Sequence, residues 1–439
     1  MTLVKTKLGT LEGIEREGCR VLFGVPYAKP PVGALRWHAP VPLDPWEGTR
    51  RAVDFPTRSM QQEHHDPVLY GPEFYDEPKY QTAISEDSLY LNIWAPESGE
   101  NLPVAFWIHG GAFMGGFGHE KPFDGAAYCR RGVILVTINY RLGPFGFLAH
   151  PWLSEENQRE TGRRVSGNWG ILDQLAALDW VRQNIACFGG DPERITVFGQ
   201  SAGSMSAQTL ISSPLAKGKI AGAILQSGLG LSYDHTLAKA EAEGVEFAAN
   251  AKVDSLQAMR ALTPEQVFAA AGPIIQRGFP KMELAYTPVI DDYLLTAGYD
   301  EAIQRGLIHR IPYMVGSTLN DIATNPEALA QGQRGLVYDA CAAFCQTLAK
   351  NGFPASYRYY FTRRLPGNDA GAFHSAELWY TFGTLARCWR PFTEADKALS
   401  ERMLDYWTNF MKTGDPNGGA LPLWRPGLSE DDVMVFDVT

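Results

Sequence analysis

The feature that most constrains the fold of this chain is a five-residue turn, Gly199-Gln200-Ser201-Ala202-Gly203. An apolar run rich in β-branched residues, at 195–198, leads into this turn, and a helical pattern follows it over residues 202–211. Glycines two residues before and after a central residue are needed where a strand turns sharply into a helix, because side chains there would collide. The sequence therefore predicts a strand, a strained turn and a helix, with the Ser201 hydroxyl raised above the edge of a sheet.

Apolar runs rich in β-branched and aromatic residues alternate with helical patterns along most of the chain. One such helix is predicted over residues 170–188. This alternation is typical of an α/β fold with a mostly parallel central sheet and helices on both faces. The predicted strands are residues 103–109, 133–140, 195–199, 221–226, 311–316 and 356–361.

The length of 439 residues exceeds that of a typical single domain, but large α/β enzymes often keep this length around one sheet. Residues 1–439 are therefore predicted to form one domain. An Ala- and Glu-rich stretch that begins at His235 predicts an inserted helical region around residues 235–285 above the sheet, where it would shape a pocket; ordinary outer-layer helices are the alternative. Residues 55–80 are interpreted as a long surface or rim loop, and its His64-His65 pair as solvated residues rather than ligands.

Composition and charge exclude several classes of function. The chain has 45% hydrophobic and 20% charged residues and a formal net charge of -10, which disfavours nucleic acid as a partner. No apolar run is long enough to span a membrane, and the N-terminus lacks a secretory signal, so a cytoplasmic location is expected. Six cysteines without a C-x-x-C pair predict reduced thiols, with Cys341 and Cys345 as packing residues rather than metal ligands. No metal or cofactor is expected.

The strand, turn and helix around Ser201 make this serine the candidate nucleophile. The pentapeptide alone would recur by chance in a glycine-rich chain, and its context gives it meaning. The first N–H groups of the following helix suit developing negative charge, so Ala202 is a predicted oxyanion donor. The small-residue loop after the strand at 103–109 supplies the other predicted donors, Gly111 and Ala112. His109 begins this loop and is interpreted as its hydrogen-bonded support.

Three histidines follow Ser201 and are candidates for the base, which comes after the nucleophile in this kind of fold. His309 precedes a strand and so lies at its wrong end, because catalytic groups gather at the carboxyl ends of strands. His235 comes too early for an acid-bearing strand to intervene. His374 follows the strand at 356–361 through a polar loop and is the predicted base.

The acid is predicted on the loop that follows the strand at 311–316, where Asp321 would hold the tautomer of the base and stabilise the imidazolium. Glu327 is the alternative acid. Asp291 and Asp292 follow another extended segment and are assigned to a turn or a salt bridge.

Short motifs from one end of the chain to the other resemble those of the type-B carboxylesterases, a family with the α/β-hydrolase fold. The matching segments include Phe23-Gly24-Val25-Pro26-Tyr27-Ala28, Ser85-Glu86-Asp87, the loop from Trp107 to Phe113, Asn139-Tyr140-Arg141, Gly167-Asn168-Trp169-Gly170, Phe188-Gly189-Gly190-Asp191-Pro192 and Gln226-Ser227-Gly228. The resemblance implies that Ser201 forms an acyl-enzyme, that His374 shuttles protons, and that Gly111, Ala112 and Ala202 bind the oxyanion.

The chain departs from the family pattern at three positions. The acid position, commonly Glu, would be the shorter Asp321. The residue before the nucleophile, often Glu, is Gln200, which removes a negative charge beside the serine and argues against a specialised cholinesterase. Ser88 stands where many secreted members have a disulfide cysteine, consistent with a reduced compartment.

The sequence as a whole predicts a cofactor-independent serine carboxylesterase that hydrolyses small, uncharged aliphatic or aryl esters with water. Alternatives are a non-catalytic recognition protein on the same scaffold, as in the neuroligins, and an amidase or acyltransferase, because other nucleophiles could intercept the acyl-enzyme.

Overall fold

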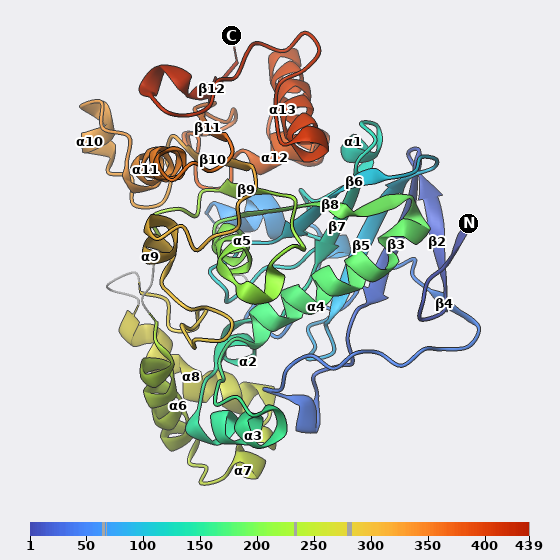
Figure 1. Cartoon of the computed structure of the whole chain (residues 1–439), viewed down its shortest axis with the longest axis vertical. Coiled ribbons are helices and arrows are strands. Elements are labelled where there is room, and N and C mark those ends of the chain that lie inside the picture. The colour runs from blue at the N-terminus through green and yellow to red at the C-terminus, as the bar shows by residue number, and fades with distance from the viewer. Residues whose placement is uncertain (64–65, 67, 232–234, 279–282, 439) are drawn as a thin grey trace.

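A computed structural model describes residues 1–63, 66, 68–231, 235–278 and 283–438. The predicted His64-His65 pair lies outside these described residues. Within them, twelve strands form one sheet (Figure 1). The strands are β1 (Thr2–Lys5), β2 (Thr10–Arg16), β3 (Cys19–Pro26), β4 (Thr49–Arg51), β5 (Tyr90–Pro96), β6 (Leu102–Ile108), β7 (Ile134–Ile138), β8 (Gly190–Gln200), β9 (Gly222–Gln226), β10 (Tyr313–Thr318), β11 (Ser356–Phe361) and β12 (Met434–Phe436).

The sheet is parallel over its central and C-terminal part and antiparallel at its N-terminal end. Its strand order is β1-β2-β3-β5-β7-β6-β8-β9-β10-β11-β12, with β4 beside β2. Along this order, each neighbouring pair from β1 to β7 is antiparallel and each pair from β7 to β12 is parallel. The short strand β4 pairs with β2 in parallel. The carboxyl ends of β6, β8, β9, β10 and β11 therefore meet at one edge of the sheet, where an α/β fold places its ligands.

Helices cover both faces of the sheet. The α-helices are α1 (Ala126–Cys129), α2 (Gly143–Phe147), α3 (Pro151–Thr161), α4 (Trp169–Asn184), α5 (Ala202–Ser212), α6 (Leu237–Ala251), α7 (Leu256–Arg260), α8 (Pro264–Gly278), α9 (Tyr299–Gln304), α10 (Pro326–Ala330), α11 (Leu336–Lys350), α12 (Leu378–Thr381) and α13 (Glu394–Thr413).

Two apolar cores lie on the two faces of the sheet, and alternate residues of each strand enter different cores. On β6, Val104 and Phe106 belong to the core beneath α4, α5 and α11, whereas Ala105 and Trp107 belong to the core beneath α1, α12 and α13. Because both faces are buried, the parallel strands are continuous apolar runs, which made them visible in the sequence.

The structure confirms all six predicted strands, and β11 has the predicted bounds. The helix predicted at 170–188 is α4 followed by a 3-10 turn, Ile185–Phe188. Strand β8 begins at Gly190 rather than Ile195, because Gly190 pairs with Leu102 of β6; residues 191–194 form an irregularity without an apolar pattern, and regular pairing resumes at Ile195.

Helices α6, α7 and α8 occupy most of the segment in which helices were predicted. They form a group at the lower end of the view, next to α2 and α3 (Figure 1). The ring of Phe268 in α8 packs 5.4 Å from that of Phe145 in α2. Arg260 in α7 donates two hydrogen bonds of 2.6 Å to Glu156 in α3. Helices α8 and α7 therefore pack against α2 and α3, respectively.

Two regions differ from the sequence-based interpretation. Strands β1 to β5 and β12 were not predicted. In β1 and β2 at most every second residue is buried, so these strands leave no apolar run. Residues 55–80 are more than a surface loop, because Phe74 and Tyr80 are buried and Glu73 lies in a π-helical turn, Gly71–Tyr75.

Candidate active site

The backbone at Ser201 has the strained conformation that the sequence predicted. Its φ of 57° and ψ of -126° lie outside the usual regions for a residue with a side chain. A Cβ on Gly203 would lie 2.0 Å from the carbonyl oxygen of Ile108, and one on Gly199 would lie 2.4 Å from the backbone of Gly203. The Ser201 N–H donates to Gln226 O in β9 at 2.9 Å. The turn is therefore fixed by the strands on both sides of β8.

Asp321 and His374 form a buried pair. Asp321 follows β10 directly, and a bridge between Asn320 and Phe373 brings His374 alongside it. His374 Nδ1 donates to Asp321 Oδ1 at 2.6 Å. Burial on its own raises the pKa of Asp321, but the imidazole of His374 and the hydrogen-bond donors around the carboxylate keep this pKa below its ordinary value. The carboxylate therefore accepts, and His374 carries its proton on Nδ1.

Three further groups orient the Asp321 carboxylate. Its Oδ2 accepts the Ser227 hydroxyl at 2.7 Å and the Thr318 N–H at 2.9 Å, and its Oδ1 accepts the Ile322 N–H at 2.8 Å. Ser227 follows β9, between the strands that carry Ser201 and Asp321. The carboxylate is thus held from three directions and aimed at the imidazole.

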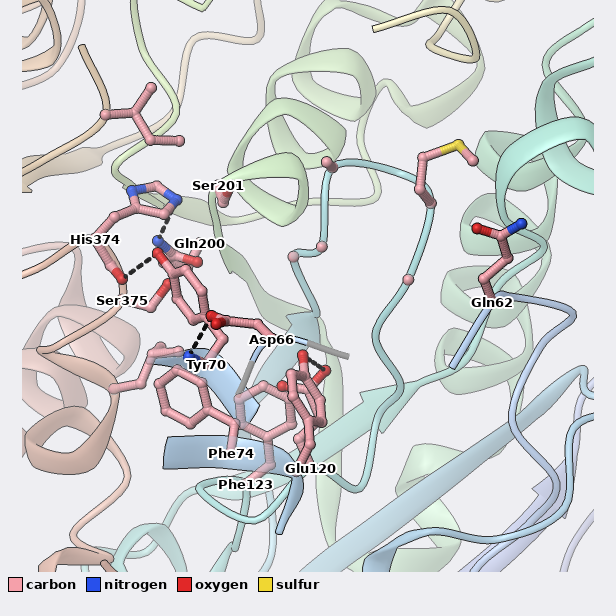
Figure 2. Close-up of a pocket in the computed structure, with 18 of the residues that line it drawn as sticks. Gln62, Asp66, Tyr70, Phe74, Glu120, Phe123, Gln200, Ser201, His374 and Ser375 are labelled. Carbon is pink, nitrogen blue, oxygen red and sulfur yellow. Dashed lines mark hydrogen bonds between the residues drawn. The ribbon is translucent and has the colours of Figure 1, made fainter. Parts of the chain in front are cut away.

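The other ring nitrogen of His374 faces Gln200, the residue before Ser201. We call the turn at residues 199–203, which carries Ser201, the elbow. Gln200 Nε2 lies 3.1 Å from His374 Nε2, and the Tyr70 hydroxyl donates to the His374 carbonyl oxygen at 3.1 Å (Figure 2). Within the described part of the chain, the Ser201 hydroxyl itself makes no hydrogen bond. His374 is therefore held at both ring nitrogens and at its backbone.

The loop after β6 presents backbone N–H groups next to Ser201. Gly111 and Ala112 both have a positive φ, 103° and 55°, so the loop turns back on itself. A Cβ on Gly111 would lie 2.2 Å from Gly115 O, which only glycine avoids. Among the described residues, the N–H groups of Gly111, Ala112 and Ala202 donate to no acceptor. All three remain available to an oxyanion.

His109 supports this loop, as the sequence predicted. Its side chain is fully buried and stacks on the ring of Tyr140, with the ring centroids 4.5 Å apart. Its Nδ1 donates to Gly110 O at 2.8 Å, and burial lowers the pKa of His109 to about 4. His109 is therefore a neutral, packed residue.

A cavity of about 590 Å³ opens above the elbow serine. Aromatic side chains gather on one side of it, below His374, and Gln62 lies on the opposite side (Figure 2). No described residue of the inserted segment at 235–278 lines it, so this segment contributes no side chain to the cavity wall. The lining residues are Gln62, Glu63, Asp66, Tyr70, Phe74, Tyr75, Gly110, Gly111, Ala112, Met114, Gly115, Glu120, Phe123, Gln200, Ser201, Ile322, His374, Ser375 and Leu378.

Three carboxyl groups line the cavity. Glu63, Asp66 and Glu120 line it, and none of the described lining residues is Lys or Arg. Glu120 is buried and its Oε1 accepts the Tyr75 hydroxyl and the Phe117 N–H, each at 3.1 Å. Burial raises the pKa of Glu120 to about 8. The cavity is thus apolar on one wall and acidic elsewhere.

The structure separates the remaining sequence candidates from this cavity. Glu327 lies in α10 and forms no contact with His374. His235 Nδ1 lies 3.2 Å from Thr287 Oγ1, and His309 Nε2 lies 3.1 Å from Ser213 O. Asp291 caps the turn at 293–295 and accepts a hydrogen bond from the Asn168 side chain, as expected for a turn residue.

Cys341 and Cys345 are free, buried residues of α11, in agreement with the packing prediction. Across the described residues, no group of three or more His, Cys, Asp or Glu side chains is arranged to hold a metal ion. None of the helices in this part of the chain combines the length and apolar composition that a membrane crossing requires.

The sequence missed several residues beside the candidate site. Glu377 is buried three residues after His374, accepts a hydrogen bond from Gln226 Nε2 at 3.3 Å, and has a pKa raised to about 7 by burial and by Asp321. Ser227 belongs to the motif Gln226-Ser227-Gly228 and directly follows a predicted strand, so its position could have identified it as a residue near the site. Tyr70 lies in an irregular segment that carries no such signal.

A serine on a strained turn after a central parallel strand, with an acid and a histidine after the following strands, defines the class of α/β-hydrolases. A model of the carboxylesterase family matches residues 1–340 and 337–439 of the chain. The chain belongs to the carboxylesterase family and is a carboxylic ester hydrolase, which confirms the prediction from its sequence motifs.

Individual relatives agree with this assignment. The chain is 32% identical over 486 residues to para-nitrobenzyl esterase of Bacillus subtilis, covering 100% of this chain and 95% of the relative. It is 40% identical over 319 residues to fumonisin B1 esterase of Sphingopyxis macrogoltabida, covering 72% of this chain but only 55% of that relative.

Solved structures of esterases have the same fold. A para-nitrobenzyl esterase structure superposes with a TM-score of 0.82 at 30% identity, covering 99% of this chain and 96% of the other. A carboxylesterase of Geobacillus stearothermophilus superposes with a TM-score of 0.80 at 31% identity, covering 100% and 96%. The chain is similar to both along nearly its whole length.

Proposed function

We propose that Ser201, His374 and Asp321 are the nucleophile, base and acid of a serine carboxylesterase. The observation that carries this proposal is the 2.6 Å hydrogen bond from His374 Nδ1 to Asp321 Oδ1, in a pair whose histidine lines the same cavity as the elbow serine. This bond leaves the lone pair of Nε2 as the proton acceptor. Asp321 keeps the imidazole in that tautomer and stabilises the imidazolium without taking the proton.

The reaction begins when His374 Nε2 takes the proton of Ser201 Oγ while Oγ forms a bond to the ester carbonyl carbon. The electrons of the carbonyl double bond move to its oxygen, to which the N–H groups of Gly111, Ala112 and Ala202 donate. The bond to the alcohol then breaks, and His374 gives its proton to the departing oxygen. Water, losing a proton to His374, releases the acid by the same steps and restores Ser201. No metal or cofactor takes part.

The cavity supports small, uncharged aliphatic or aryl esters as substrates. Its aromatic wall, which includes Tyr70 and Phe74, suits an apolar acyl or alcohol group. The side chains of Glu63 and Asp66 also line the cavity, where negative charge disfavours an anionic substrate.

Hydrolysis of a panel of nitrophenyl esters by the native protein and by Ser201→Ala tests this function. We expect turnover of neutral acetyl, butyryl and benzoyl esters, a loss of at least about 10³-fold in kcat for Ser201→Ala, and about tenfold lower kcat/KM for an anionic hemisuccinate ester. Ser98→Ala is the matched control, because Ser98 is exposed in a loop between β5 and β6. Undiminished turnover by Ser201→Ala would contradict the proposed nucleophile.

We also propose that residues 1–439 form one domain with an inserted helical region around residues 235–285. In support, Phe247 of α6 and Val267 of α8 belong to the same apolar core as Val104 of the sheet. A cytoplasmic location is proposed as well, on the grounds that all six cysteines are unpaired, as expected in a reducing compartment.

A further inference from the structure

The proton-accepting nitrogen of the base already has a partner in this structure. Because Nδ1 donates to Asp321, the neutral imidazole of His374 has only a lone pair at Nε2. The group that faces this lone pair at 3.1 Å is the side-chain nitrogen of Gln200, and a carboxamide nitrogen is a donor only. Gln200 therefore donates a hydrogen bond to the lone pair that must later accept the Ser201 proton.

The surroundings of Gln200 fix this arrangement. Its side-chain oxygen lies over Gly110, where a Cβ would be only 3.2 Å away from it. A side chain at position 110 would therefore crowd the carboxamide, and glycine leaves it room between the oxyanion loop and the base. Gln200 is 3% exposed and His374 is 8% exposed, so water scarcely competes for this bond (Figure 2).

We propose that Gln200 is a positioning residue that holds the His374 ring oriented through Nε2 in the resting enzyme, and releases Nε2 to the Ser201 hydroxyl when an ester is bound. This inference rests on the proposed roles of Ser201 and His374. A hydrogen bond to the neutral form of a base opposes its protonation by solvent. A carboxamide at position 200 therefore keeps the base available at lower pH than a carboxylate there would, because a carboxylate favours the imidazolium.

Other titratable groups also lie near His374, and they are the same in every variant at position 200. Asp321 pairs with Nδ1, and Glu377, with a pKa raised to about 7 by burial, lies in the same segment. The Tyr70 hydroxyl bonds the His374 carbonyl, and Glu120 lines the same cavity with a pKa raised to about 8 by burial. Because these groups stay constant, a difference between variants at position 200 isolates the effect of Gln200.

The test is the pH profile of kcat/KM for a neutral nitrophenyl ester. We expect Gln200→Glu to move the midpoint of the acid limb to higher pH by about one unit or more, because the new carboxylate stabilises the protonated imidazole. Gln200→Met, which only removes the donor, should move it in the same direction by about half as much. Gln62→Glu is the matched control, since it adds the same charge across the cavity, away from His374 (Figure 2), and should leave the midpoint in place.

The possible outcomes separate this inference from the proposed function. A merely structural role of Gln200 would lower activity without moving the midpoint, and an unmoved midpoint in both variants would overturn the inference while Ser201→Ala remained inactive. If Gln200→Glu does not fold, as judged by circular dichroism and thermal unfolding, the midpoint of Gln200→Met decides alone. Full activity of Ser201→Ala would instead overturn the proposed function.

Discussion

At the scale of single residues, the proposed acid Asp321 has a shorter side chain than the Glu that the family pattern led us to expect. The bridge between Asn320 and Phe373 compensates, because it brings the loops that carry the proposed acid and the proposed base into direct contact. Ser227 and Thr318 then fix the second carboxylate oxygen. The backbone bridge and the hydrogen bonds from neighbouring residues therefore position Asp321, and a longer side chain is not needed.

Replacing Asp321 by Asn tests this assignment. The amide would offer its nitrogen or oxygen to Nδ1 without the charge, so the wrong tautomer would be favoured and the imidazolium would lose its partner. We expect kcat to fall by about 10⁴-fold with KM little changed, measured by steady-state kinetics on a neutral nitrophenyl ester.

Glu327→Gln is the matched control for this prediction, because Glu327 lies on α10 and is exposed. It should retain native kcat. Loss of activity in Glu327→Gln together with a mild effect of Asp321→Asn would show that the acid had been assigned to the wrong loop.

At the scale of elements, the contact between β8 and α5 depends on glycine at the elbow. A methyl group on Gly203 would meet the Ile108 carbonyl oxygen at 2.0 Å, and backbone atoms of a buried strand cannot move aside cheaply. We expect Gly203→Ala to destabilise the protein by about 3 kcal/mol or more and to abolish turnover, measured by urea unfolding and ester hydrolysis.

Gly272→Ala provides the comparison. Gly272 lies inside α8, and a Cβ placed there meets no atom apart from its chain neighbours. The better helix propensity of alanine is opposed by contact with the ring of the following Pro273, so we expect Gly272→Ala to change the free energy of unfolding by less than about 1 kcal/mol. Equal losses in the two variants would mean that contact at the elbow is not what requires glycine.

Burial explains part of what could be predicted. Strands β6 to β11 were predicted because both of their faces are buried, which leaves continuous apolar runs. The three-residue parallel strands β4 and β12 were missed, and so were β3 and β5 although they are largely buried. Strands β1 and β2 were missed because one face is exposed. The turn at Gly71–Tyr75 was missed because its buried residue Glu73 is charged, and only a distant partner makes its burial possible.

At the scale of the whole molecule, one buried ion pair ties an N-terminal segment to the C-terminal part of the chain. Glu73 and Arg390 are both buried, and Arg390 Nε lies 3.0 Å from Glu73 Oε1. The indole N–H groups of Trp379 and Trp389 also donate to Glu73, at 2.7 and 3.2 Å. The next residue, Phe74, lines the cavity, so this cluster positions part of the aromatic wall.

Glu73→Gln would leave the Arg390 guanidinium buried without a counter-charge. We expect a loss of about 3–5 kcal/mol in the free energy of unfolding, and a raised KM for aryl esters as Phe74 shifts. The measurements are urea unfolding and ester kinetics. Glu301→Gln, which removes a half-exposed pair with Arg305, should change stability by less than about 0.5 kcal/mol. Comparable losses in the two variants would mean that burial does not determine how much the Glu73–Arg390 pair contributes to the free energy of unfolding.

The candidate site was predictable where chain order and local motifs defined it. Ser201, Asp321 and His374 each follow a buried strand, and the structure brings the last two into contact. The partners from elsewhere in the chain could not be predicted in the same way. Tyr70 reaches His374 from an irregular segment, and the orientation of Gln200 depends on the tautomer that Asp321 imposes.

The order of the strands has a consequence for protein synthesis. The proposed nucleophile, Ser201, follows β8, whereas the proposed base, His374, follows β11, which pairs with β10 and with the C-terminal strand β12. A ribosome therefore finishes the elbow, the oxyanion loop and their helices long before it makes His374. The growing chain carries Ser201 without the proposed base during all of that time, and the cavity itself is completed only when Ile322, His374, Ser375 and Leu378 have been made.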